Sequence, residues 1–314
     1  MSKNLPKYTI KQLLEAGAHF GHRSMRRNPK MAKYVHSNRN GVSIIDLNKT
    51  ATLLYKSLNI VYDIAKNNGR ILFVSTKRQG SPIVAEAAKR CGQYYVNFRW
   101  LGGMLTNWKT VSQSIKTLRK IEAQLIGEDG AEYNKKEKLN LERQRLKLEQ
   151  ALGGIKNIGG YPDLVFVIDI NKEEIAVKEA QKLNIPIMAV VDTNCDPDQV
   201  SYIIPGNDDS SKAIKLFCNL IADAAIAGMR ENMAASGIDL SNTKSDELPE
   251  FALNKEVAKV EAKKDDKKRD KKKIIFDAAE TEVKKEIKDE SGEEVVKKKV
   301  SAKKPAVKKP TVKK

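Results

Sequence analysis

The sequence predicts an α/β fold, in which helices cover both faces of a parallel β-sheet. Short apolar runs alternate along the chain with longer stretches whose apolar residues recur at helical spacing. The runs are rich in Val and Ile and lack polar alternation, as is typical of strands buried on both faces. Parallel strands need right-handed crossovers, and the intervening helices supply them. The candidate strands are Ile71–Val74, Leu164–Ile168, Ile187–Val191 and Tyr202–Ile204.

A short helix and a hairpin precede this sheet. The helix is predicted over Thr9–Ala16, with its first residue as the N-cap and Gly17 as the terminator. Two extended segments, Tyr34–Ser37 and Val42–Ile45, flank the sequence NRNG. Its pair Asn40-Gly41 predicts a tight hairpin turn, because both residue types tolerate a positive φ.

The longer helices follow the hairpin and alternate with the candidate strands. Gly69 follows the first of them, and glycine is common just after helix ends. These helices are predicted over about Asn48–Asn67, Pro82–Cys91, Glu173–Leu183 and Ser210–Ala227.

Residues 108–153 interrupt the alternation and predict an inserted helical hairpin. This segment has no strand signal but has two apolar stripes, with Gly127 and Gly130 between them. We expect two antiparallel helices projecting from the sheet domain, as a rigid strut or as a docking arm with outward Lys and Arg. The first stripe consists of Val111, Ile115, Leu118 and Leu125. The second consists of Leu141, Leu148 and Leu152, with an apolar face widened by Leu139 and Leu146.

The end of the chain has the composition of a disordered, Lys-rich tail. Residues 251–314 carry 22 Lys/Arg and 13 Asp/Glu, so half of the net charge of +18 lies there. Such a segment cannot bury enough apolar surface to offset its ordering entropy. It is either a solvated extension or an arm that adds non-specific affinity for RNA. We expect an α/β domain over residues 1–230, a linker over 231–250 and the tail over 251–314.

The other half of the positive charge lies on a body large enough to bury a core. A basic body with a pI near 9.6 indicates a polyanionic partner, usually nucleic acid. No apolar run reaches the ~18 residues of a membrane span, and the N-terminus lacks the apolar core of a signal peptide. The three cysteines, Cys91, Cys195 and Cys218, are odd in number and widely spaced, which favours a reducing, cytoplasmic setting without disulfides.

The stretch RWLGGMLTN, residues 99–107, is the most informative local motif. Arg99 can grip phosphate or stack on a base, and Trp100 offers a flat apolar face with one donor. The alternative for Trp100 is a buried plug at a tight turn. Two glycines follow, where another backbone can approach closely, and then Thr106 and Asn107 as N-caps for a helix near Trp108.

A basic segment before the hairpin is the best candidate for binding phosphate. It carries five cations within eleven residues, which repel one another unless an anion is near; a solvated basic loop is the alternative. Further candidates follow the first strand, at the edge where open α/β sheets bind ligands, and lie around RWLGGMLTN. The complete predicted set is Arg23, Arg26, Arg27, Lys30, Lys33, Lys77, Arg78, Arg99, Trp100, Asn107 and Lys109.

Neither the acidic residues nor the histidines define a catalytic site. Asp192, Asp196 and Asp198 have the chemistry of a tight loop, and Asn207 and Asp208 suit the cap of the last helix. Magnesium beside a phosphate substrate is the alternative. A zinc site built from His19, His22 and either Cys91 or Cys195 would have only one close ligand pair, so we predict no metal and no cofactor. Glycine-rich phosphate loops and a nucleophile elbow are absent from the sequence, which argues against an enzyme.

Six blocks, in this order and at this spacing, resemble the bacterial ribosomal protein S2 family (uS2). They are HFGHRSMRRNPKM (19–31), NGVSIIDLNKT (40–50), ILFVSTKRQ (71–79), RWLGGMLTN (99–107), PDLVFVIDINKEEIAVKEAQKLNIP (162–186) and VDTNCDPDQVSYIIPGNDD (191–209). The resemblance covers about residues 8–230 and excludes the tail.

The resemblance implies a three-layer, flavodoxin-like sheet with a coiled-coil insertion. It also implies a structural role in the small ribosomal subunit. The implied partners are small-subunit rRNA and neighbouring ribosomal proteins, including the large messenger-binding protein built of repeated OB domains. A nucleotide- or flavin-binding α/β enzyme is the alternative function, because the predicted sheet resembles that of flavodoxins and fold alone does not decide function.

Overall fold

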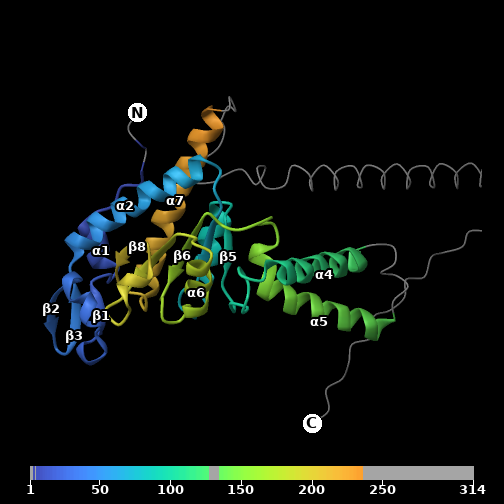
Figure 1. Ribbon diagram of the computed structural model, residues 1–314, viewed down its shortest axis with the longest axis horizontal. Coiled ribbons are helices and arrows are strands. Elements are labelled where there is room, and N and C mark those ends of the chain that lie inside the picture. The colour runs from blue at the N-terminus through green and yellow to red at the C-terminus, as the bar shows by residue number, and fades with distance from the viewer. Residues whose placement is uncertain (1–2, 4, 127–133, 236–314) are drawn as a thin grey trace, which may run out of the picture. The chain divides into compact units, whose positions relative to one another are not determined.

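A computed structural model describes residues 3, 5–126 and 134–235 of the chain. Its main sheet has five parallel strands in the order β5-β4-β6-β7-β8. Counted along the chain this order is 2-1-3-4-5, the flavodoxin-like order. Figure 1 labels β8, β6 and β5 of this sheet, from left to right. The strands are β4 (Ile71–Val74), β5 (Tyr94–Val96), β6 (Leu164–Ile168), β7 (Ile187–Val191) and β8 (Tyr202–Pro205).

The sheet is the middle of three layers, because its strands alternate side chains between two apolar cores. Ile71 and Phe73 of β4 belong to one core, whereas Leu72 and Val74 belong to the other. The first core packs against α2 (Leu47–Lys66), α3 (Ser81–Arg90) and α7 (Ser211–Ala235); the second packs against α6 (Glu174–Lys182). The predicted α/β fold with a parallel sheet is therefore confirmed.

The segment before the sheet contains the predicted helix and hairpin. Helix α1 (Ile10–Glu15) has Thr9 as its N-cap in a capping box with Gln12, and Gly17 has a φ of 75°. The hairpin pairs β2 (Val35–Arg39) with β3 (Val42–Ile45) through a turn in which Asn40 and Gly41 have positive φ.

One strand of this small antiparallel sheet was not predicted. Strand β1 (Phe20–Arg23) pairs with β3 and leads into the basic segment, residues 23–33, in which the sequence shows no strand signal. The rest of that segment forms two 3₁₀-helices, η1 (Ser24–Arg26) and η2 (Pro29–Tyr34). The four-residue strand FGHR carries no apolar alternation, so its pairing depends on β3 rather than on its own pattern.

The inserted segment forms two helices in contact, α4 (Trp108–Ile126) and α5 (Lys135–Leu152). Val111, Ile115 and Leu118 are buried as predicted. Leu139 and Leu146 are exposed, so they do not widen the apolar face as we expected. Lys156, which follows α5 and the short 3₁₀-helix after it, forms an ion pair with Glu122 of α4 and ties the end of the insertion to its first helix.

Helix α7 runs to Ala235, five residues into the segment that we expected to be a linker. The apolar spacing of its first turns continues to that point, and no Gly or Pro falls between Gly228 and Ala235 to stop it. The remainder of the predicted linker, residues 236–250, and the predicted disordered tail, residues 251–314, lie outside the described residues.

Candidate nucleic-acid interface

Most predicted RNA-binding residues lie near the carboxyl edge of the parallel sheet. Lys77 and Arg78 follow β4, and Arg99 follows β5. The basic segment reaches the same edge, because the Asn28 amide donates to the Thr193 carbonyl after β7 at 2.8 Å. The strand order places β5 and β7 three strands apart, roughly 14 Å at the usual spacing.

The basic segment is held tightly against the loop after β7. The His22 amide donates to Thr193 Oγ1 at 2.9 Å. Gly21 is required beside it, because a Cβ there would lie 2.6 Å from Thr193 Cγ2. The segment is therefore fixed at its base while its long cationic side chains extend outward.

The five cations of the basic segment differ in how available their charges are. Lys30 pairs with Asp196 at 2.9 Å and with Asp198 at 2.7 Å. The Nζ atom of Lys33 lies 5.1 Å from the centroid of the Tyr34 ring, so its charge faces that ring. The other three, Arg23, Arg26 and Arg27, are exposed and form no ion pair within the described ranges. These arginines are the cations best placed to bind an external anion.

Lys77 does not have the role that we predicted for it. Its ammonium lies 3.1 Å from Asp169, 3.0 Å from Asp208 and 2.5 Å from Asp209. The lysine side chain is only 14% exposed. Three carboxylates already satisfy its three donors, so Lys77 neutralises this chain's own acids and has no donor left for phosphate.

His22 and Asp192 extend these carboxylates into a sheet-edge acidic cluster, which we define as His22, Asp169, Asp192, Asp208 and Asp209. Nδ1 of His22 lies 2.8 Å from Asp192 Oδ2, and its Nε2 lies 3.5 Å from Asp209 Oδ2. The hydrogen bond to Asp192 raises the pKa of His22. Burial, with repulsion from Asp169 and Asp192, raises the pKa of Asp208 to about 7.

The same cluster is where the described chain could hold a cation. His22, Asp192, Asp208 and Asp209 each offer one ligand atom, all within 4.8 Å of one another. Oδ2 of Asp208 is buried without a hydrogen-bond partner. These groups differ from the His–Cys set that we weighed for zinc. Carboxylates replace His19, and Cys195 instead groups with Asp169 and Asp208.

Trp100 is too deeply buried to stack on a base. The residue is only 6% exposed, and its indole N–H donates to Glu179 Oε1 at 3.1 Å. No open ring face remains for a base. The alternative reading, a buried plug at a tight turn, describes Trp100 correctly.

Glu179 on α6 organises the whole RWLGGMLTN loop, and sequence reasoning missed it. Its Oε1 also accepts from the Gly103 amide at 2.7 Å. Its Oε2 accepts from the Leu105 amide at 2.9 Å, the Thr106 amide at 3.1 Å and the Thr106 hydroxyl at 3.2 Å. Burial alone would raise the pKa of Glu179, but these hydrogen bonds outweigh it and lower that pKa.

The remaining predicted residues, Arg78, Arg99, Asn107 and Lys109, are all exposed. Arg78, Arg99 and Lys109 form no ion pair in the part of the chain that the structure describes. The Asn107 side chain accepts from the Thr110 hydroxyl at 3.0 Å, at the start of α4. Arg99 and Asn107 belong to the loop whose backbone Glu179 fixes, and Lys109 follows it in the first turn of α4.

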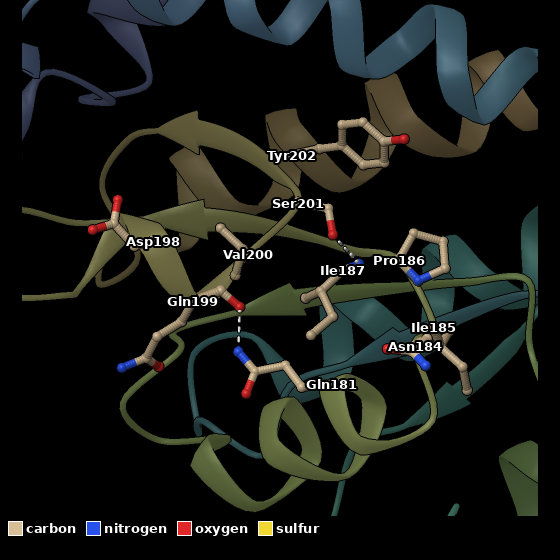
Figure 2. Close-up of a pocket in the computed structure, with 10 residues that line it drawn as sticks. All are labelled: Gln181, Asn184, Ile185, Pro186, Ile187, Asp198, Gln199, Val200, Ser201 and Tyr202. Carbon is tan, nitrogen blue, oxygen red and sulfur yellow. Dashed lines mark hydrogen bonds between the residues drawn. The ribbon is translucent and has the colours of Figure 1, made fainter.

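Two hollows lie at opposite edges of the main sheet. One, of about 500 Å³ at the carboxyl edge, is lined partly by Phe98, Lys172 and Ile175, none of which we predicted. Figure 2 shows the other, of about 420 Å³ at the amino ends of β7 and β8. There Gln181 donates to the Gln199 carbonyl, and Asp198 is the single charged lining residue. The second hollow therefore does not suit an anion.

The fold and the site together define a doubly wound α/β domain. At the carboxyl edge of its sheet, where such domains bind ligands, it presents arginines rather than a glycine-rich phosphate loop. A model of ribosomal protein S2 matches residues 13–228. The chain belongs to the ribosomal protein S2 family, which is structural and not enzymatic.

Several curated relatives support this membership. A protein of Rhizobium meliloti (strain 1021) is 57% identical over 245 residues, 78% of this chain and 95% of its own length. One from Brucella anthropi is 57% identical over 236 residues, 75% of this chain and 92% of its own. One from Bradyrhizobium sp. (strain BTAi1) is 56% identical over 248 residues, 78% of this chain and 75% of its own. Each is named small ribosomal subunit protein uS2.

Among the described helices, none is long and apolar enough to cross a membrane.

Proposed function

We propose that this chain is a structural constituent of the small ribosomal subunit and binds its rRNA through the basic segment and the carboxyl edge of the sheet. The observation that carries this is the contrast between two groups of cations. Lys77 forms ion pairs with three carboxylates of this chain. Three arginines, Arg23, Arg26 and Arg27, are exposed without an ion pair in the described structure. Arginines held on a fixed base are suited to bidentate phosphate contacts.

The inserted helices form a second contact in this proposal. We propose that α4 and α5 act as a coiled-coil arm, whose exposed Lys and Arg approach RNA while its base stays in the second core. From the family resemblance, the partners include neighbouring small-subunit proteins and the large OB-repeat messenger-binding protein. The tail, residues 251–314, adds non-specific affinity through its net positive charge.

A nucleotide- or flavin-binding enzyme is not favoured. Flavodoxin-like sheets that bind such cofactors cradle phosphate with backbone amides at the loop ends. Here the amides of Gly103, Leu105 and Thr106 already bind Glu179, and the Thr76 amide binds Glu173. A yellow preparation, or a thermal shift with added nucleotide, would support the enzyme instead.

Incorporation of charge-reversed protein into subunits tests the proposal. Arg26→Glu with Arg27→Glu should lower the occupancy of tagged protein in small-subunit fractions of a sucrose gradient without unfolding the domain, because repulsion replaces phosphate contacts. The control, Lys56→Glu with Lys215→Glu, makes the same charge change at exposed positions on α2 and α7 and should leave occupancy unchanged. Equal occupancy of both variants would count against the assigned interface.

A further inference from the structure

The hollow at the carboxyl edge lies where a flavodoxin-like sheet reverses its strand order. β4 is flanked by β5 and β6, so the connections leave β4 and β6 in opposite directions. Ligands of doubly wound sheets bind in the crevice at this switch point. The hollow, of about 500 Å³, is lined from all three strands: Thr76 follows β4, residues 98–100 follow β5, and residues 172, 173 and 175 follow β6. We call it the switch-point hollow.

Two large apolar side chains stand open at the switch-point hollow. Phe98 is 60% exposed and Ile175 is 55% exposed, although most apolar side chains of this size in the domain are buried. Each leaves apolar surface in water that a flat ligand would cover, at a gain of about 25 cal/mol per Å². An exposed ring beside a cation is the arrangement with which proteins stack unpaired bases.

The charges around the hollow separate a rim from a floor. Arg99 and Lys172 are exposed at the rim, and neither forms an ion pair within the described ranges. Glu173 is buried, and its Oε1 accepts from the amide and the hydroxyl of Thr76, each at 2.6 Å. A phosphate is therefore attracted to the rim and repelled from the floor. A base, which carries no charge, suits the interior.

We propose that the switch-point hollow receives one unpaired nucleotide of an RNA strand, with its base against Phe98 and Ile175 and its flanking phosphates on Arg99 and Lys172. This rests on the proposed RNA-binding function and names the RNA feature that this edge recognises: a bulged or looped nucleotide. A free mononucleotide does not fit, because Glu173 and Glu179 occupy the backbone amides that would cradle its phosphate.

Binding of a short, unstructured oligouridylate to the full-length chain, followed by fluorescence anisotropy, tests this. Phe98→Ala should weaken binding by about five- to 150-fold, the range for losing one base–aromatic stack. Tyr55→Ala is the matched control, because Tyr55 is 56% exposed on α2, in the layer over the other face of the sheet. It should bind as the unmodified chain does.

A second readout uses assembled small subunits and does not depend on a variant. Ultraviolet cross-linking followed by trypsin should place a nucleotide on Phe98, within the peptide that runs from Cys91 to Arg99. Equal binding of Phe98→Ala and Tyr55→Ala, or cross-links that avoid Phe98, would overturn the inference. Stoichiometric binding of free AMP or FMN that Phe98→Ala abolishes would also overturn it. If Arg26→Glu with Arg27→Glu weakens RNA binding while Phe98→Ala does not, the switch-point hollow does not receive a nucleotide and the proposed function stands.

Discussion

Removing the carboxylate of Glu179 should unfasten the loop that carries Arg99. Glu179 accepts five hydrogen bonds from this loop, all from residues more than seventy positions earlier in the chain. In Glu179→Ala the exposed donors of Thr106 can turn to water, and the half-exposed amide of Gly103 can do so in part. The Trp100 indole and the Leu105 amide cannot, because both residues are buried.

The magnitude follows from the two buried donors. Each buried donor left without a partner costs about 1–3 kcal/mol, so Glu179→Ala should lower the free energy of unfolding by roughly 2–6 kcal/mol. This is a large share of the ~5–15 kcal/mol that stabilises a typical domain. Glu179→Gln keeps the volume but sets an NH₂ against two or three donors, so it should cost at least about 1 kcal/mol.

Urea unfolding of the full-length chain, followed by tryptophan fluorescence, measures this directly. Of the two tryptophans, Trp100 lies within the loop and Trp108 follows it directly, so their fluorescence reports on it. Glu174→Gln is the matched control, because Glu174 lies on the same helix in an exposed ion pair with Lys178. Its free energy of unfolding should change by less than about 1 kcal/mol. If Glu179→Gln proves as stable as Glu174→Gln, Glu179 does not fasten the loop through these hydrogen bonds.

Three further predictions concern other parts of the chain. Gly21→Ala should lower the free energy of unfolding by about 1–3 kcal/mol in thermal or urea melts, because its Cβ meets Thr193; a neutral effect would mean that the basic segment is not fixed as described. The raised pKa of Asp208, about 7 against an ordinary 3.8, makes the folded state hold a proton between these values, so the free energy of unfolding falls as pH rises through that range. Asp208→Asn should flatten this slope, and an unchanged slope would contradict the assignment. Deleting residues 251–314 should leave incorporation into small subunits intact, because the arginines of the body remain; its loss would make the tail the active part.

The regular elements could be predicted because their signals are local. The buried strand Leu164–Ile168 is a continuous apolar run, and the Asn40-Gly41 turn declares itself by residue type alone. Strands β1 and β5 were missed because neither contains a run of aliphatic residues: FGHR ends in two polar residues, and YYV has a single Val. The positions of Leu139 and Leu146 predicted a wider buried face on α5, but both side chains are exposed because α4 does not cover that side of the helix.

The sequence predicted where the candidate site lies but not which side chains form ion pairs or hydrogen bonds within it. The sequence placed cations after the strands of the sheet, and the structure brings them to one edge. The sequence alone could not show that Lys77 faces three carboxylates, because these lie 92 to 132 residues later in the chain. Glu179 looked like any helical glutamate for the same reason. Phe98 could have been proposed from the sequence, because it is an aromatic residue next to Arg99. We chose Trp100, the other aromatic neighbour of Arg99, for base stacking instead.

The most direct test of the central claim is to purify the tagged chain from cells at moderate salt and to quantify the RNA and proteins that come with it. We expect near-stoichiometric small-subunit rRNA together with the other proteins of that subunit. Tagged chain that remains at the top of a sucrose gradient, free of rRNA, would contradict it.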